Sequence, residues 1–267
     1  DANTAIGYGS LLANTTGVAN TGIGYLSLFS NTEGSYNTAL SRQALYSNTT
    51  ADSNTAGGSN AMYENTTGAN NTALGRGALT ANTTADNNTA IGKDAMVVNT
   101  TGANNTAVGA LTLDANTTAS NNTAIGSYAL TANTTGTGNT AVGNDCMDSN
   151  TTGSQNTAIG LDSLQANTTA SDNTAVGFKT LFACTTGTLN VAIGNQALMT
   201  TVDQNYQTAV GDRALQSATG GDNTALGGLA GFNITSGASN LLIGRNAGRS
   251  SAPGGEFTTE DNRIVIG

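Results

Sequence analysis

The stretch that decides the fold reads Asn88-Thr89-Ala90-Ile91-Gly92-Lys93-Asp94-Ala95-Met96-Val97-Val98-Asn99-Thr100-Thr101-Gly102-Ala103-Asn104. Its consensus is Asn-Thr-Ala-Ile-Gly, then Ala-Leu, then Asn-Thr-Thr-Gly, and it returns every 17 residues along the 267-residue chain. A fixed short period is the signature of a solenoid, in which each repeat forms one coil and buries its surface against its neighbours. The first asparagine of the unit falls at Asn3, Asn20, Asn37, Asn54, Asn71, Asn88, Asn105, Asn122, Asn139, Asn156, Asn173 and Asn190, and the series continues at Gln207, Asn223, Asn240 and a weak last copy, Ile264–Gly267.

Numbering each unit from this asparagine as position 1, position 4 is aliphatic in most units and position 9 is Leu or Met in 13 successive units, Leu11 to Leu215. Glycine at position 5 and the Asn-Thr-Thr-Gly group are turn signals, and the apolar segments between them are too short for helices. The sequence therefore predicts an all-β, parallel β-solenoid (β-roll) of about sixteen 17-residue coils. Each coil is expected to contain two short strands joined by two turns, so that stacking gives two long sheets.

Side chains alternate across a strand, which divides the unit into two faces. Taking the aliphatic residue at position 4 and the Leu at position 9 as inward, Thr at position 2 is inward too, while the alanines at positions 3 and 8 point outward. The outward alanine column, which includes Ala107 and Ala124, is then a predicted contact between chains. A homo-oligomer, with a trimer favoured, is the expected partner arrangement.

Composition excludes several classes of function. The net charge is −9 with only 8 basic residues, which disfavours binding to nucleic acid phosphates. The chain has no His, so His-based triads and His-ligated metal sites are excluded, and its glycines recur as coil turns rather than as a dinucleotide fingerprint. No apolar run reaches the length of a membrane span. We therefore expect no enzyme activity, no cofactor and no metal.

Two cysteines, Cys146 and Cys184, lie two coils apart at different positions of the unit. Coils stack at ~4.8 Å, so the two residues are separated by ~9.6 Å along the axis, beyond the reach of a disulfide. Both are predicted to be free thiols that fill small spaces.

Asparagine at position 12 has two interpretations. It tolerates left-handed turns and can form side-chain ladders between coils. Asn-Thr-Thr is also an N-glycosylation sequon, so the alternative is a column of glycans. The candidate residues are Asn14, Asn48, Asn65, Asn82, Asn99, Asn116, Asn133, Asn150 and Asn167.

Position 10 carries Leu12, Phe29, Tyr46 and Tyr63 in four consecutive coils and then becomes polar. Rings aligned at ~4.8 Å are suited to stacking. One interpretation is a stabilising ladder, and the other is a surface strip, Phe29, Tyr46 and Tyr63, that binds sugars or another protein.

Residues 1–222 form the regular region, and residues 223–267 form a divergent region with an insertion around Pro253. In the divergent region Gly231 and Gly248 replace the Leu of position 9. Atypical terminal repeats are expected to cap a solenoid or to join it to something else. The chain begins at Asp1 without an initiator Met or a signal peptide, which suggests a mature or trimmed form.

The Asn-Thr-Ala-Ile-Gly and Ala-Leu units resemble the heads of trimeric autotransporter adhesins, which wind as β-roll trimers. They resemble more closely a class of phage tail-fibre and fibre-like surface proteins built of Asn-Thr-Ala-x-Gly and Asn-Thr-Thr-Gly units, in which tracts such as Ser239–Gly248 often lead into a cleavable folding chaperone. The resemblance implies an extracellular, structural and trimeric protein.

Three functions follow as expectations. The first is a non-enzymatic fibre, stalk or adhesin of an extracellular appendage or virion, which meets a cell-surface glycan or receptor. The second is a self-assembling, glycosylated filament subunit that stacks end to end through open strand edges. The third is an ice-binding solenoid, suggested by Thr columns such as Thr72, Thr89, Thr106 and Thr123. Electron microscopy separates discrete rods from long polymers, and a thermal-hysteresis assay tests ice binding.

Overall fold

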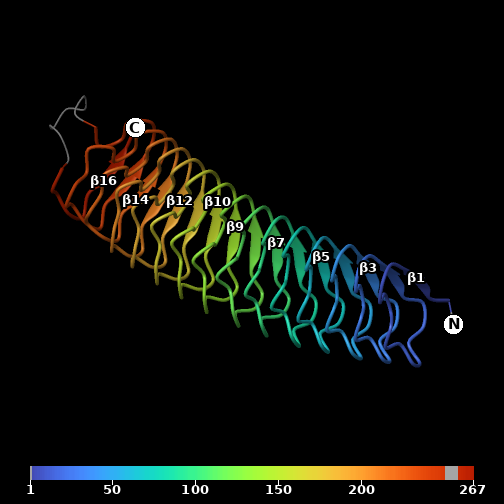
Figure 1. Ribbon diagram of the computed structural model, residues 1–267. Coiled ribbons are helices and arrows are strands. Elements are labelled where there is room, and N and C mark those ends of the chain that lie inside the picture. Colours follow the sequence, from blue (N-terminus) through green and yellow to red (C-terminus); the bar gives the residue numbers. More distant parts are fainter. Residues whose placement is uncertain (1, 250–257) are drawn as a thin grey trace. The chain divides into compact units, whose positions relative to one another are not determined.

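The computed structural model describes residues 2–249 and 258–267, and the chain forms two compact units, unit 1 (Asp1–Thr137) and unit 2 (Gly138–Gly267). In both units every strand has three residues and pairs in parallel with the neighbouring strands of the same unit (Figure 1). The strands of unit 1 are β1 Thr4–Ile6, β2 Thr21–Ile23, β3 Thr38–Leu40, β4 Thr55–Gly57, β5 Thr72–Leu74, β6 Thr89–Ile91, β7 Thr106–Val108 and β8 Thr123–Ile125. Those of unit 2 are β9 Thr140–Val142, β10 Thr157–Ile159, β11 Thr174–Val176, β12 Val191–Ile193, β13 Thr208–Val210, β14 Thr224–Leu226, β15 Leu241–Ile243 and β16 Ile264–Ile266.

The register between strands follows the sequence period. Thr72 lies opposite Thr89, 17 residues on, and this step holds through unit 1. In unit 2 it shortens to 16 between Thr208 and Thr224 and lengthens to 23 between Leu241 and Ile264. Both units are therefore parallel β-solenoids with a 17-residue coil, as predicted. The described ranges contain no helix, and so none that could cross a membrane.

The second predicted strand of each coil is not a strand, and this prediction is wrong. The Leu or Met at position 9 lies in the left-handed region, with φ of 51° at Met96 and 54° at Leu130. A left-handed turn of a non-glycine residue costs about 1–2 kcal/mol, but it bends the chain enough to bring positions 8 and 9 to the same side. Backbone hydrogen bonds between coils continue there, as from Leu28 N to Ala44 O at 3.0 Å. Each coil thus has one strand wall and one wall of bonded turns.

Burial also corrects the predicted faces. Ala90 and Ala124 at position 3 are 0% exposed, whereas Ile91 and Ile125 at position 4 are 38% and 40% exposed. The Thr residues at position 2 lie on the same outer side of the strand as position 4. Alanine at position 8 is buried together with the Leu of position 9, and only the inward Leu was predicted correctly.

The narrow interior explains why alanine is inside. Gly22 occupies position 3, and a Cβ on it would lie 2.5 Å from Ser10 Oγ at position 8 and 3.5 Å from Leu11 Cγ at position 9. The strand wall therefore faces the long side chain of position 9 directly. Only small residues fit opposite a Leu or Met in so thin a core, because interiors are close-packed. An Ile there would overfill the coil, so the Ile points outward.

Two ladders of buried asparagine side chains form hydrogen bonds with one another and with buried backbone groups in the rest of the interior. At position 1, Asn88 N donates to Asn71 Oδ1 at 2.9 Å, and Asn88 Nδ2 donates to Gly102 O at 2.9 Å. At position 12, Asn116 Nδ2 donates to Asn99 Oδ1 at 2.8 Å, and Asn99 Nδ2 donates to Gly102 O at 2.9 Å. These first and second Asn ladders confirm the predicted coil-to-coil satisfaction of asparagine. Their hydrogen bonds supply stability that so thin a coil cannot gain by burying apolar side chains.

Departures from the ladders leave buried polar atoms unpaired. Asn167 Oδ1 has no hydrogen-bond partner because Cys184 stands where the next asparagine of the second ladder would be. Gln207, one methylene longer than the Asn of position 1, leaves both its amide oxygen and its amide nitrogen without a partner. A buried polar atom without a hydrogen bond costs about 1–3 kcal/mol.

Replacing Gln207 by Asn should therefore stabilise unit 2 by about 1–3 kcal/mol, because the shorter amide can rejoin the first ladder. The measurement is the denaturant midpoint of the variant against that of the native chain. Gln216→Asn shortens a partly buried glutamine outside the ladders, on the outer side of the same coil, and serves as the control. Destabilisation by Gln207→Asn would show that the coil around Gln207 has adapted to the longer side chain.

In the divergent region a smaller residue at one interior position is offset by larger residues at others, so the interior stays filled. Gly231 replaces the Leu of position 9. A Cβ added to Gly231 would lie 2.7 Å from Leu215 Cδ2 and 3.4 Å from Leu242 Cδ1. Leu242 stands at position 3 and Ile234 at position 12, and each is 1% exposed. Larger residues at positions 3 and 12 thus occupy the space that position 9 gives up. Pro253 and most of the predicted insertion lie outside the described residues.

Both cysteines are buried and free, as predicted. Cys146 Sγ donates to Ala158 O at 3.3 Å, and Cys184 Sγ donates to Gly187 O at 3.4 Å. Burial raises the pKa of Cys146 to about 12 and that of Cys184 to about 11.

The native protein should therefore leave both thiols unmodified by a disulfide reagent at pH 8, because the reactive thiolate is neither formed nor accessible. The same reagent should titrate two thiols per chain in denaturant. Rapid modification of either thiol in the native protein would contradict the assigned burial.

Candidate functional site

The chemical variety of this chain is concentrated on three positions of the coil. Positions 6, 7 and 10 hold 9 of the 11 described aromatic residues and 7 of the 8 basic residues. Contacts join these positions, since Thr80 Oγ1 at position 10 donates to Asn60 O at position 7 of the preceding coil at 3.2 Å. We call this surface the variable face. Its aromatic members are Tyr8, Tyr25, Phe29, Tyr46, Tyr63, Tyr128, Phe178, Phe182 and Phe232, and its basic members are Arg42, Arg76, Lys93, Lys179, Arg213, Arg245 and Arg249.

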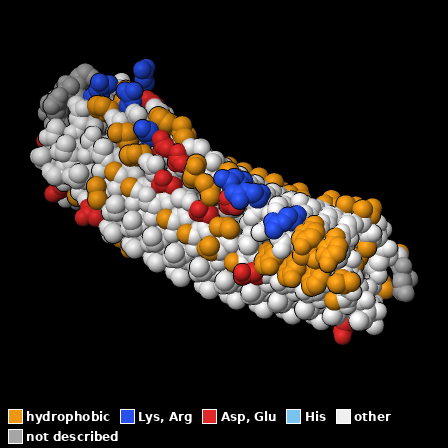
Figure 2. Space-filling view, viewed as in Figure 1, with side chains coloured by type: hydrophobic (Ala, Val, Ile, Leu, Met, Phe, Trp, Pro, Cys, Tyr) orange, Lys and Arg blue, Asp and Glu red, His pale blue; other side chains and the backbone are white. Residues whose placement is uncertain are grey.

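The predicted aromatic strip forms on the variable face of unit 1. Phe29 and Tyr46 stack with ring centroids 5.2 Å apart, and Tyr46 and Tyr63 stack at 4.9 Å. A second pair, Tyr8 and Tyr25 at position 6, stacks at 5.6 Å and was missed in the sequence, although the two tyrosines recur at one position. In Figure 2 this hydrophobic cluster lies close to basic side chains of the same unit. The aromatic strip therefore borders a charged surface.

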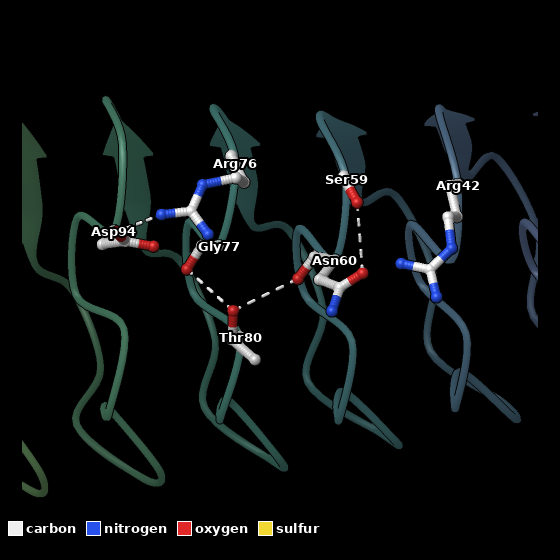
Figure 3. A pocket seen from close by; sticks show the side chains of 7 residues that line it. All are labelled: Arg42, Ser59, Asn60, Arg76, Gly77, Thr80 and Asp94. Atoms are coloured by element: carbon white, nitrogen blue, oxygen red, sulfur yellow. Dashed lines mark hydrogen bonds and ion pairs between the residues drawn. The ribbon is translucent and has the colours of Figure 1, made fainter.

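Next to the aromatic strip is an open pocket of about 260 Å³, shown in Figure 3. It extends along the column of position 6, which in four consecutive coils reads Arg42, Ser59, Arg76 and Lys93. These three basic residues are the only ones in unit 1. The lining side chains come from positions 6, 7 and 10, and they are Arg42, Ser59, Asn60, Arg76, Gly77, Thr80 and Asp94.

The two guanidinium groups of the pocket differ in their pairing. Arg76 Nη2 lies 3.0 Å from Asp94 Oδ2, and the Arg76 side chain is 63% exposed. Lys93 Nζ approaches the same carboxylate at 3.8 Å. In the described part of the structure Arg42 has no ion pair or side-chain hydrogen bond, and in Figure 3 it extends along the pocket. One fully available guanidinium and one weakly paired guanidinium thus flank Ser59 and Asn60.

Gly77 contributes only backbone to the lining of this pocket. It is buried with φ of +71°, and a Cβ at this residue would collide with the carboxylate of Asp94. The neighbouring Thr80 ends the aromatic column, and its hydroxyl donates to Gly77 O at 2.8 Å. The floor is therefore backbone and hydroxyl, and no aliphatic side chain lines the pocket.

Unit 2 carries a different arrangement on its variable face. Lys179 Nζ lies 5.4 Å from the ring centroid of Phe178 and 5.1 Å from that of Phe182, and 3.9 Å from Asp162 Oδ2. Asp148 at position 10 accepts hydrogen bonds from Ser149 and Gln165, and its pKa is raised above the usual value mainly by burial. Lys179 is therefore engaged by two aromatic rings and a carboxylate.

The sequon asparagines lie inside the solenoid. Asn14 is partly exposed, and the other eight are fully buried in the second Asn ladder. In Asn65, for example, the nitrogen that would carry a sugar donates to Asn48 Oδ1 and to Gly68 O, both at 2.9 Å. The ladder accounts for the repeated asparagine by itself. Glycosylation stays a prediction, and it would require modification before the coils close.

The described residues contain no group of three or more His, Cys, Asp or Glu side chains placed to hold a metal ion. The variable face offers guanidinium groups, carboxylates, hydroxyls, an amide and aromatic rings. Comparison with models of protein families and with curated proteins found no match.

Proposed function

We propose that this chain is a non-enzymatic fibre or stalk segment of an extracellular appendage or virion, and that it self-associates through the outer side of its strands. This surface, the strand face, consists of positions 2 and 4. Its position-4 column carries aliphatic side chains in nearly every coil, and in unit 1 only Gly57 interrupts it. The most exposed position-4 members of unit 1 are Ile6 58%, Ile23 38%, Leu40 44%, Leu74 41%, Ile91 38% and Ile125 40%.

An exposed aliphatic column of this length is the observation that carries the proposal. Isolated apolar residues on a surface are ordinary, but contiguous patches mark contact surfaces. A second copy of the chain suits this column, because it offers the same aliphatic side chain at the same axial spacing. The resemblance to trimeric β-rolls favours three chains around this face. The strand face is therefore the proposed interface, in place of the alanine column, which is buried and cannot form one.

The test is the native mass of the double variant Ile91→Arg/Ile125→Arg, measured by sedimentation. We expect dissociation to monomers with an unchanged β-type circular dichroism spectrum, since both side chains already face outward. Val98→Arg is the matched control, because Val98 is also 40% exposed but lies at position 11. A native chain that sediments as a monomer, or a double variant with an unchanged oligomer, would contradict the proposal.

One observation favours ice binding as a second candidate. All eight strands of unit 1 begin with a Thr, and these threonines lie in register on the strand face beside the aliphatic column. A flat array of Thr and aliphatic side chains at a fixed spacing is suited to ordering water. Thermal hysteresis of the native chain that disappears in Thr89→Arg/Thr106→Arg would support this candidate, and its absence in the native chain would exclude it.

A further inference from the structure

We propose that the pocket between Arg42 and Arg76 binds an acidic saccharide, a sugar carrying a carboxylate or a sulfate group. The inference concerns the variable face of unit 1 and is independent of how the strand face is used. It goes beyond the predicted aromatic strip by assigning a cationic site and a class of ligand.

The charge distribution gives the first argument. The chain has a net charge of −9, yet all three basic residues of unit 1 lie in one column within four consecutive coils. Arg42 and Arg76 stand two coils apart, which corresponds to ~9.6 Å, so a single ring-sized ligand can meet both. A guanidinium group presents several N–H donors in a plane that matches a carboxylate or a sulfate.

The lining gives the second argument. Between the two arginines lie the hydroxyls of Ser59 and Thr80 and the amide of Asn60, groups that both donate and accept hydrogen bonds. Ser59 Oγ now donates to the amide oxygen of Asn60 at 3.3 Å, a weak bond that a ligand hydroxyl can replace. Sugar hydroxyls require this mixture of donors and acceptors, whereas a peptide ligand relies on an apolar anchor that the lining lacks.

The surroundings give the third argument. The position-10 column passes from Tyr63 to Thr80, so the ring of Tyr63 adjoins the coil whose hydroxyl lines the pocket. An apolar ring beside a polar, cationic pocket suits the C–H surface of a further sugar unit. The carboxylate of Asp94 lies on the far side of Arg76 and directs an anionic group toward Arg42. Nucleic acid does not fit, because three basic residues on an acidic chain provide too little phosphate neutralisation.

Calorimetric titration of the full chain tests the proposal with four probes: tetragalacturonate, a chondroitin sulfate tetrasaccharide, cellotetraose and tetraglutamate. We expect one of the two acidic saccharides to bind more tightly than cellotetraose and tetraglutamate, and the two acidic probes then distinguish carboxylate from sulfate recognition. The double variant Arg42→Gln/Arg76→Gln should weaken that binding by about tenfold or more, since each 1.4 kcal/mol lost is a factor of ten.

The control is Arg245→Gln, which removes one arginine, against two in the double variant, from position 6 of a coil in unit 2, where Arg245 is also exposed. It should leave binding unchanged. Failure of both acidic saccharides to bind, equal binding of tetraglutamate, an unaffected double variant, or an equal loss in Arg245→Gln would each overturn the proposal. Unchanged circular dichroism of the double variant verifies that the solenoid is intact.

Discussion

Replacing Asn99 by Leu should lower the free energy of unfolding by about 3–5 kcal/mol. The side chain is fully buried, and the change removes three hydrogen bonds: Asn99 Nδ2 no longer donates to Asn82 Oδ1 and Gly102 O, and Asn116 Nδ2 no longer donates to Asn99 Oδ1. Gly102 O keeps Asn88 Nδ2 and Asn116 Nδ2 keeps Ala119 O, but Asn82 Oδ1 loses its partner. Each lost hydrogen bond is worth about 0.5–1.5 kcal/mol, the unpaired buried oxygen costs about 1–3 kcal/mol, and the larger apolar side chain does not recover this cost in a coil that is already full. Chemical denaturation followed by circular dichroism gives the value.

Asn104→Leu is the matched control for this substitution. Asn104 stands at position 17, where it is exposed and has φ of 57°. Leu189 occupies the equivalent position of a later coil at φ of 60°, so the backbone accepts Leu there. If Asn104→Leu lowered the free energy of unfolding as much as Asn99→Leu, asparagine would stabilise the coil through its turn conformation rather than through the ladder.

Replacing Ala124 by Arg should have the largest effect and prevent the coil from closing. Ala124 is 0% exposed, and the strand wall at this position faces the side chains of positions 8 and 9. A guanidinium group forced into this space is both overpacked and buried without a partner, which together exceed about 4 kcal/mol. Limited proteolysis should cleave the variant in unit 1 under conditions that leave the native chain intact.

Ile125→Arg, one residue further, should by contrast leave the coil folded and resistant to protease. Its side chain is 40% exposed and points away from the core. A folded, protease-resistant Ala124→Arg protein beside an unfolded Ile125→Arg protein would reverse the assignment of the two faces.

The period, the parallel stacking and the Asn ladders could all be predicted from the sequence. Repetition of one asparagine every 17 residues leaves few ways to pair short strands other than in register, as in Thr72 opposite Thr89. The free state of Cys146 and Cys184 followed from their separation by two coils along the axis.

The direction of the strand side chains could not be predicted correctly, for a physical reason. Alternation separates Ala90 from Ile91 but does not say which of them is inside, and hydrophobicity alone favours Ile. The deciding factor is the thickness of the coil, which depends on the left-handed turn at Met96. That turn replaces the second expected strand and brings position 9 across the interior, leaving space only for alanine.

The candidate site could likewise be predicted only in part from the sequence. Phe29, Tyr46 and Tyr63 share one position, so their stacking could be predicted. The pocket combines positions 6, 7 and 10 of successive coils, and those positions meet only because of the turns between them. The run Arg42, Ser59, Arg76 and Lys93 at position 6 was readable in the sequence, but its proximity to Thr80 was not.

Thiol labelling of two single variants, Ala124→Cys and Ile125→Cys, tests the inward and outward assignment most directly. The native thiols give no background, because Cys146 and Cys184 are buried with raised pKa values. In dilute protein at pH 8 we expect Cys at residue 125 to react at least ~100-fold faster than Cys at residue 124, which reacts only when the coil opens. Equal rates, or faster reaction at residue 124, would contradict a solenoid with alanine inside and isoleucine outside.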